Sequence, residues 1–85
     1  MIHALELQLK SSPEILERVL RVTRHRGFKV TNMNMTAENG NIFFALTVET
    51  ERRIELLSNQ LNKLVDVYYC QVLPQVLKTK EAIAR

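Results

Sequence analysis

The chain has 85 residues, of which 46% are apolar and 25% are charged, and its formal net charge at pH 7 is +3. This length allows one small domain with a thin core, because chains of this size bury only about 60% of their unfolded surface. A single cysteine excludes an internal disulfide and a Cys-x-x-Cys metal or redox site. No apolar run approaches the roughly 18 residues of a membrane span, and the start lacks the pattern of a signal peptide. We therefore expect a cytoplasmic protein with no membrane partner.

The first predicted element is a strand over residues 4–10. Apolar and polar side chains alternate there, which is the period-two pattern of a half-buried strand. The face that we expect to be buried consists of Leu5, Leu7 and Leu9.

A helix is predicted over residues 13–26, because apolar residues recur at helical spacing from Ile15 onward. Its start has two candidate signals that stay open: Ser12 as the N-cap, or Ser11 and Glu14 as a capping box. Gly27 supplies the left-handed position that ends a helix. Two ion pairs are expected along it, Glu14–Arg18 and Glu17–Arg21.

The second predicted strand begins at Phe28 and changes its alternation halfway. Val30 keeps the initial phase, whereas the next apolar residues, Met33 and Met35, are shifted by one. We favour a bulge near Thr31 over methionines on a second face.

Residues 38–41 are predicted to form a hairpin turn, because Asn39-Gly40 suits a turn with positive φ at both central positions. A third strand follows, with one apolar face made of Ile42, Phe44, Leu46 and Val48.

A second helix is predicted over residues 51–63, with Thr50 as its cap. A fourth strand over residues 65–73 is apolar on both faces. We expect Val67 and Tyr69 on one face and Cys70 on the other, with Cys70 as buried filler.

The order strand-helix-strand-strand-helix-strand predicts an α+β, ferredoxin-like βαββαβ sandwich: a four-stranded antiparallel sheet with two helices on one face. Residues 1–74 form the expected single domain, and residues 75–85 a tail that is a short helix or a mobile arm. The second sheet face and the methionine-bearing edge strand are left without cover, which favours self-association or a partner.

Three sequence runs also carry a family resemblance: Leu-Glu-Arg-Val-Leu-Arg-Val at residues 16–22, Arg-Gly-Phe at 26–28 and Leu-Asn-Lys-Leu-Val-Asp-Val at 61–67. Together with the order of elements, they resemble ACT domains, and among these the small regulatory subunits of acetolactate synthases of the isozyme II type. The resemblance covers about residues 4–71.

The resemblance implies a non-catalytic subunit that forms a homodimer through its sheets and activates a large catalytic subunit in branched-chain amino acid (valine, leucine, isoleucine) biosynthesis. In that family thiamine diphosphate, Mg and FAD are held by the large subunit. We therefore expect no cofactor and no metal on this chain. The alternative is a stand-alone ACT-type domain that senses an amino acid.

The loop that holds the effector in valine-sensitive relatives departs from the family pattern in this chain. Those relatives carry Asn-x-x-Gly after the first strand and an Asn soon after the glycine that ends the first helix. Here the corresponding residues are Ser11, Ser12, Pro13 and Glu14 in the loop, and Lys29 after the glycine. Glu14 would face the effector's carboxylate and Pro13 lacks an amide donor, so the resemblance implies a subunit that is insensitive to valine.

Two groups of residues are candidate contacts for the large subunit. The first is basic and consists of Arg18, Arg21, Arg24 and Arg26; the second lies on the edge strand and consists of Asn32, Met33, Asn34 and Met35. Arginine suits interface ion pairs, and methionine fills irregular gaps. A solvated helix face explains the basic group equally well. RNA binding is disfavoured because the first strand has no aromatic residue on which bases could stack, and no catalytic constellation is evident.

Overall fold

The computed structural model describes residues 1–74. Its elements are, in chain order, β1 (Ile2–Lys10), α1 (Ile15–His25), β2 (Lys29–Glu38), β3 (Asn41–Glu49), α2 (Glu55–Leu61) and β4 (Val67–Val72). The predicted tail, residues 75–85, lies outside the described residues. Within residues 1–74 no helix is long and apolar enough to cross a membrane.

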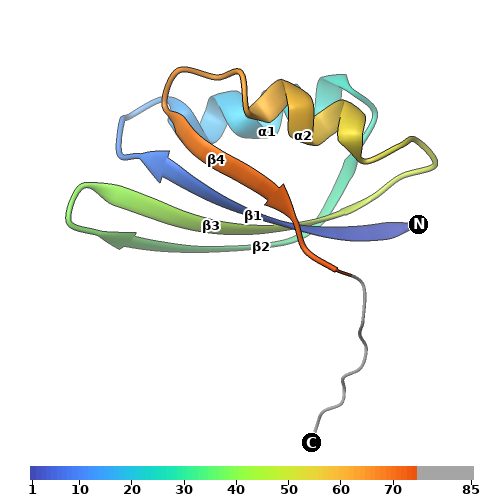
Figure 1. The fold of residues 1–85 in the computed structure, drawn as a ribbon, viewed down its shortest axis with the longest axis horizontal. Coiled ribbons are helices and arrows are strands. Elements are labelled where there is room, and N and C mark those ends of the chain that lie inside the picture. Colours follow the sequence, from blue (N-terminus) through green and yellow to red (C-terminus); the bar gives the residue numbers. More distant parts are fainter. Residues whose placement is uncertain (75–85) are drawn as a thin grey trace, which may run out of the picture.

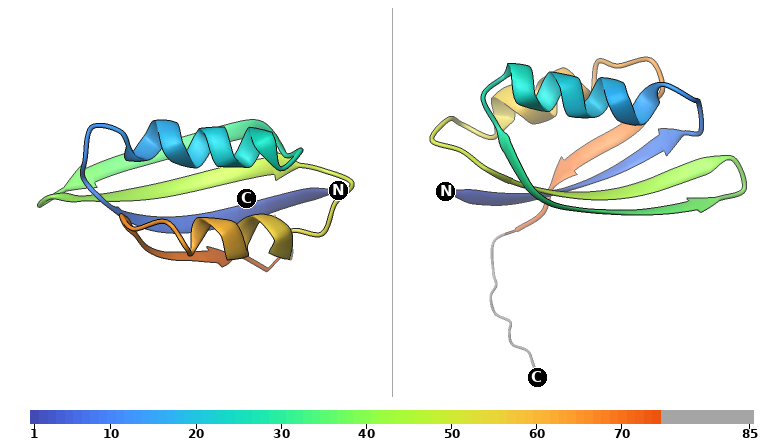
Figure 2. Two further views of the ribbon diagram at one scale, coloured as in Figure 1. Left: turned by 90° about the horizontal axis from the view of Figure 1, so that it is seen from above. Right: turned by 180° about the vertical axis from the view of Figure 1, so that it is seen from behind.

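The four strands form one antiparallel sheet in the order β2-β3-β1-β4, as Figure 1 shows. Both helices lie on the same face of this sheet, and they run side by side when the sheet is viewed from the helix side (Figure 2). The predicted ferredoxin-like sandwich is therefore confirmed.

The core lies between the helices and the two central strands. Both predicted alternations are confirmed, because the odd-numbered leucines of β1 are fully buried and the four apolar residues predicted for β3 are at most 6% exposed. The helices complete the core with Ile15, Val19, Leu57 and Leu61.

The predicted bulge in β2 is present. The pairing of β2 with β3 shifts between Val30 and Asn32, so that Thr31 is the extra residue. Beyond the bulge Met33 and Met35 lie opposite the buried Leu46 and Phe44, and therefore point to the helix side of the sheet. Because β2 is an edge strand, both methionines stay about half exposed, at 52% and 48%.

Neither predicted start of α1 is correct. The helix begins at Ile15 rather than at residue 13, and its N-cap residue, Glu14, makes no side-chain cap hydrogen bond. The Ser12 hydroxyl instead donates to a carboxylate oxygen of Asp66, at 3.4 Å. A tertiary partner has thus replaced the local cap. The end of the helix is as predicted, because Gly27 has φ +85°.

The second helix is shorter than predicted. It begins at Glu55 instead of residue 51 and ends at Leu61. Thr50 is not its cap: the Thr50 hydroxyl oxygen accepts the N–H of Arg52 at 2.9 Å, within a turn that precedes the helix.

The fourth strand contains a bulge that the sequence pattern did not predict. Leu9 lies opposite Val67 and Gln8 opposite Tyr69, so Tyr68 is an extra residue. Val67 and Cys70 consequently share the helix face, with 7% and 6% exposure. The predicted placement of these two residues on opposite faces was wrong.

The turn between β2 and β3 is as predicted. Asn39 and Gly40 have φ of +53° and +81°, the positive values that a two-residue hairpin turn requires.

Candidate functional site: an interhelical groove and an open sheet edge

The described residues contain no evident catalytic or metal centre. Nowhere in residues 1–74 do three or more His, Cys, Asp or Glu side chains gather in a geometry that could hold a metal ion. The thiol of Cys70 is buried, and this burial raises its pKa to about 12, so it is a poor nucleophile at neutral pH. The geometry directs attention to binding surfaces.

The basic residues of α1 differ in whether a carboxylate neutralises them. Arg18 pairs with Glu14 at 3.5 Å, as expected, but the expected pair between Glu17 and Arg21 is absent. A second ion pair joins Arg53 to Glu55 at 3.6 Å. The remaining predicted basic contacts, Arg21, Arg24 and Arg26, are exposed and have no acidic partner in this part of the chain.

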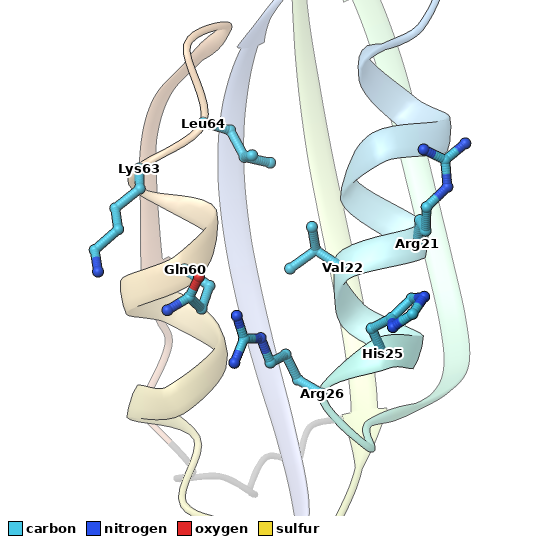
Figure 3. A pocket seen from close by; sticks show the side chains of 7 residues that line it. All are labelled: Arg21, Val22, His25, Arg26, Gln60, Lys63 and Leu64. Atoms are coloured by element: carbon cyan, nitrogen blue, oxygen red, sulfur yellow. The ribbon is translucent and has the colours of Figure 1, made fainter.

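Arg21 and Arg26 contribute to a groove between the two helices, which Figure 3 shows from close by. We call it the interhelical groove; its volume is about 510 Å³ and its lining is Arg21, Val22, His25, Arg26, Gln60, Lys63 and Leu64. Val22 and Leu64 point toward each other and form an apolar floor, and Arg26 extends between the helices toward Gln60 (Figure 3). Arg26 thus lies beside the apolar floor, and Arg21 and Lys63 line the outer margins of the groove (Figure 3).

A further cation lies close to the end of α1. A Cβ atom at residue 27 would lie 2.9 Å from Nε of Arg52, so the Arg52 side chain packs directly against the backbone of Gly27. The Thr50 hydroxyl donates to the Gly27 carbonyl at 3.5 Å and holds this loop in place. The structure therefore brings Arg52 to the basic end of α1, which local sequence could not indicate because 25 positions separate the two residues.

The predicted contact residues on β2 are divided between the two sides of the sheet. Asn32 and Asn34 lie opposite Thr47 and Ala45, on the open face, whereas Met33 and Met35 point to the helix side. The open face has a hollow of about 230 Å³, lined by Glu6, Asn34, Thr36, Phe43, Phe44 and Ala45. A partner that contacts all four predicted residues must approach the edge itself.

The two edges of the sheet differ in their free hydrogen-bonding groups. On β4, the Asn62 side-chain nitrogen donates to the Cys70 carbonyl at 2.9 Å, and its Oδ1 accepts the Cys70 N–H, also at 2.9 Å. Asn62 therefore occupies the outer edge of β4. Among the described residues the backbone of β2 has no comparable cover, and every residue from 31 to 38 is exposed. Sequence reasoning missed Asn62, although it lies in the run Leu-Asn-Lys-Leu-Val-Asp-Val.

The predicted effector positions do not meet within one chain. Ser11, Ser12 and Glu14 follow the end of β1, where the Ser11 N–H donates to the Gly40 carbonyl at 2.9 Å. Lys29 lies opposite Glu49, which pairs with Ile2 at the other end of β1. These ends are eight residue steps apart along β1, which corresponds to about 26 Å. A site that uses both groups needs a second copy of the chain.

Comparison with known proteins agrees with this architecture. A family model described as "ACT domain" matches residues 11–70. The chain is 50% identical over 74 residues to the acetolactate synthase isozyme 2 small subunit of Escherichia coli K12, and the match covers 85% of both chains. The same identity and coverage apply to the protein of that name from Shigella flexneri.

Solved structures show the same fold at low sequence identity. The acetolactate synthase small subunit of Thermotoga maritima aligns with a TM-score of 0.78 and 19% identity, over 89% of this chain and 49% of that one. The ACT domain of a GTP pyrophosphokinase from Chlorobium tepidum aligns with a TM-score of 0.74 and 13% identity, over 86% and 97%. The chain therefore belongs to the ACT domain family and, within it, to the family of the acetolactate synthase isozyme 2 small subunits.

Proposed function

We propose that this chain is the non-catalytic regulatory small subunit of an acetolactate synthase, in branched-chain amino acid biosynthesis in the cytoplasm. The observation that carries the proposal is the 50% identity to an isozyme 2 small subunit over 85% of both chains. Thiamine diphosphate, Mg and FAD are expected on the large catalytic subunit. This chain supplies contact surface only.

Activation by such a subunit requires contacts that favour the active form of the large subunit. A bound protein shifts a conformational equilibrium only by its differential affinity for the two forms. The exposed basic end of α1 is a surface of this chain that can make such contacts.

Reconstitution tests the proposal. The purified chain is mixed with the large subunit encoded beside it, and acetolactate formation and co-elution on size exclusion are measured. We expect a stable complex and higher activity than that of the large subunit alone. Unchanged activity together with separate elution would overturn the proposal.

We further propose that the chain forms a homodimer through its sheet, at the edge strand β2. The support is the difference between the two edges: Asn62 covers β4, whereas β2 presents a ten-residue strand with Met33 and Met35 half exposed. Long uncovered edge strands pair readily with other strands.

Sedimentation equilibrium tests this dimer. Met33→Lys with Met35→Lys places like charges along the pairing edge, and we expect a monomer. Leu56→Lys is the matched control, because Leu56 is exposed to the same 48% as Met35 but lies on α2. A dimer that survives the double substitution would place the interface elsewhere.

Valine is not an effector of this subunit, in our proposal. The support is the loop chemistry: Glu14 brings a carboxylate where a carboxylate ligand would lie, and Lys29 stands in place of an Asn. Calorimetry of the purified chain with valine should give no heat beyond dilution. Micromolar binding would contradict this and would favour the alternative, a stand-alone amino-acid sensor.

A further inference from the structure

The chemical character of the interhelical groove indicates what kind of segment can bind there. The floor of the groove is apolar, from Val22 and Leu64, and its lining also includes Arg21, Arg26 and Lys63. Arg26 extends between the helices, whereas Arg21 and Lys63 lie at the two outer margins (Figure 3). No carboxylate lines the groove. The glutamates nearest in sequence, Glu14 and Glu17, line a neighbouring hollow, which shares Arg21 with the groove.

We propose that this groove receives an acidic segment of the catalytic subunit, in which an apolar side chain lies on the floor and flanking Asp or Glu residues pair with Arg26 and Lys63. The inference rests on the proposed function, since it assigns that complex its docking site. Charge complementarity of this kind steers association and sets the register of docking. Arg26 is the central anchor, because its guanidinium lies between the two helices (Figure 3) and arginine binds carboxylates with two parallel hydrogen bonds.

Other occupants fit the groove less well. A second copy of this chain that met the groove with its own groove would bring like charges together. The chain's own residues 75–85 contain three cations, Lys78, Lys80 and Arg85, and one acid, Glu81, so their charge has the wrong sign. A nucleic acid would leave the apolar floor of Val22 and Leu64 without a matching group.

The helix dipole alone does not account for the arrangement. It favours basic residues in the last turn of α1, such as Arg24. It does not explain why Lys63, in the turn after α2, also lines the groove, or why Arg21 lacks the acid at position 17 as a partner. Basic residues from two separate segments therefore line the groove, and no carboxylate does.

The test uses the reconstituted complex with the large subunit. Arg26→Glu and Lys63→Glu should each weaken binding at least about 10-fold, which is the effect of losing a central interface residue. Arg53→Glu is the matched control: Arg53 is an exposed cation outside the groove, paired with Glu55, and its variant should bind within about 2-fold of the unmodified chain. All three variants should keep the circular dichroism and unfolding midpoint of the parent.

Hydrogen exchange locates the contact independently of any substitution. In the complex of the unmodified chain, amides of residues 21–27 and 60–64 should exchange more slowly than in the free subunit. Protection confined to other residues, or undiminished binding by both groove variants, would overturn the docking site while leaving the proposed function intact. Failure of the unmodified chain to bind the large subunit would overturn both.

Two further outcomes identify a different occupant. If Arg26→Glu converts the free subunit from dimer to monomer in sedimentation, the groove belongs to self-association. If a labelled single-stranded RNA binds the free subunit and Arg26→Glu abolishes that binding, the groove is a nucleic-acid site. Either result overturns the proposal.

Discussion

Replacing Asn62 by Ala tests how much stability the covered edge of β4 contributes. The Asn62 side chain makes three hydrogen bonds, two to the backbone of Cys70 at 2.9 Å and one to the Ser58 carbonyl at 3.0 Å. The Ser58 carbonyl keeps a partner in the variant, because it also accepts the backbone N–H of Asn62. The N–H and C=O of Cys70 lose theirs.

The expected loss follows from these two groups. A net contribution of about 1 kcal/mol for each hydrogen bond to Cys70 gives a decrease of about 2 kcal/mol in the free energy of unfolding. Because 1 kcal/mol shifts the midpoint of a domain this size by about 4–8 °C, the Tm should fall by about 10 °C. Water at the sheet edge replaces part of each bond, which keeps the loss from being larger.

Urea unfolding at one fixed protein concentration measures the effect, since dimerisation makes apparent stability depend on concentration. Asn59→Ala is the matched control, because Asn59 is an exposed asparagine of α2, the helix that Asn62 directly follows, and makes no side-chain hydrogen bond in the described part of the chain. If the two variants unfold within about 0.5 kcal/mol of each other, the Asn62 bonds do not stabilise β4 as we argue.

Two further predictions concern the end of α1 and the thiol. Gly27→Ala should lower the free energy of unfolding by about 1–2 kcal/mol, because alanine is strained at φ +85°. Adding Arg52→Ala to this variant removes the clash between the new Cβ atom and the Arg52 side chain but leaves the backbone strain. Full recovery of stability in urea unfolding of the double variant would refute the explanation by strain. Cys70 should resist thiol reagents in the native state at pH 8 and react once urea unfolds the chain. The raised pKa of Cys70 also makes the free energy of unfolding fall as pH rises from 9.0, where the unfolded thiol ionises, toward about 12, where the native thiol ionises. Cys70→Ala should lack this part of the decrease. Identical plots of unfolding free energy against pH for the parent and for Cys70→Ala would contradict the prediction.

The strands of this protein could be predicted from sequence where one face is buried and the other is not. In β1 and β3 the alternation is regular, since a residue that breaks it would put a polar side chain into the core. The bulge in β2 was predictable for the same reason: Met33 breaks the phase that Val30 begins. The bulge in β4 was not, because apolar residues on both faces of that strand conceal a change of phase.

Helix starts were predicted less well than helix ends. Gly27 ends α1 through its own backbone conformation, which is a local property. Ser12 and Thr50 were expected to cap helices, but each makes a different contact, with Asp66 and with the turn at Arg52. Hydroxyl side chains have several partners of similar strength, so tertiary structure chooses among them.

By itself the sequence determined the order of the elements, the buried faces of the central strands and the family, because these depend on periodicity and on residues next to one another in the chain. Only the tertiary structure decided which surfaces are free to bind. It placed Arg26 and Lys63 in the lining of one groove, paired the outer backbone groups of Cys70 on β4 with Asn62, and left β2 without such cover. The groove and the open edge depend on how distant segments pack, and the Asn62–Cys70 contact depends on the turn between α2 and β4. None of these arrangements leaves a periodic signal in the sequence.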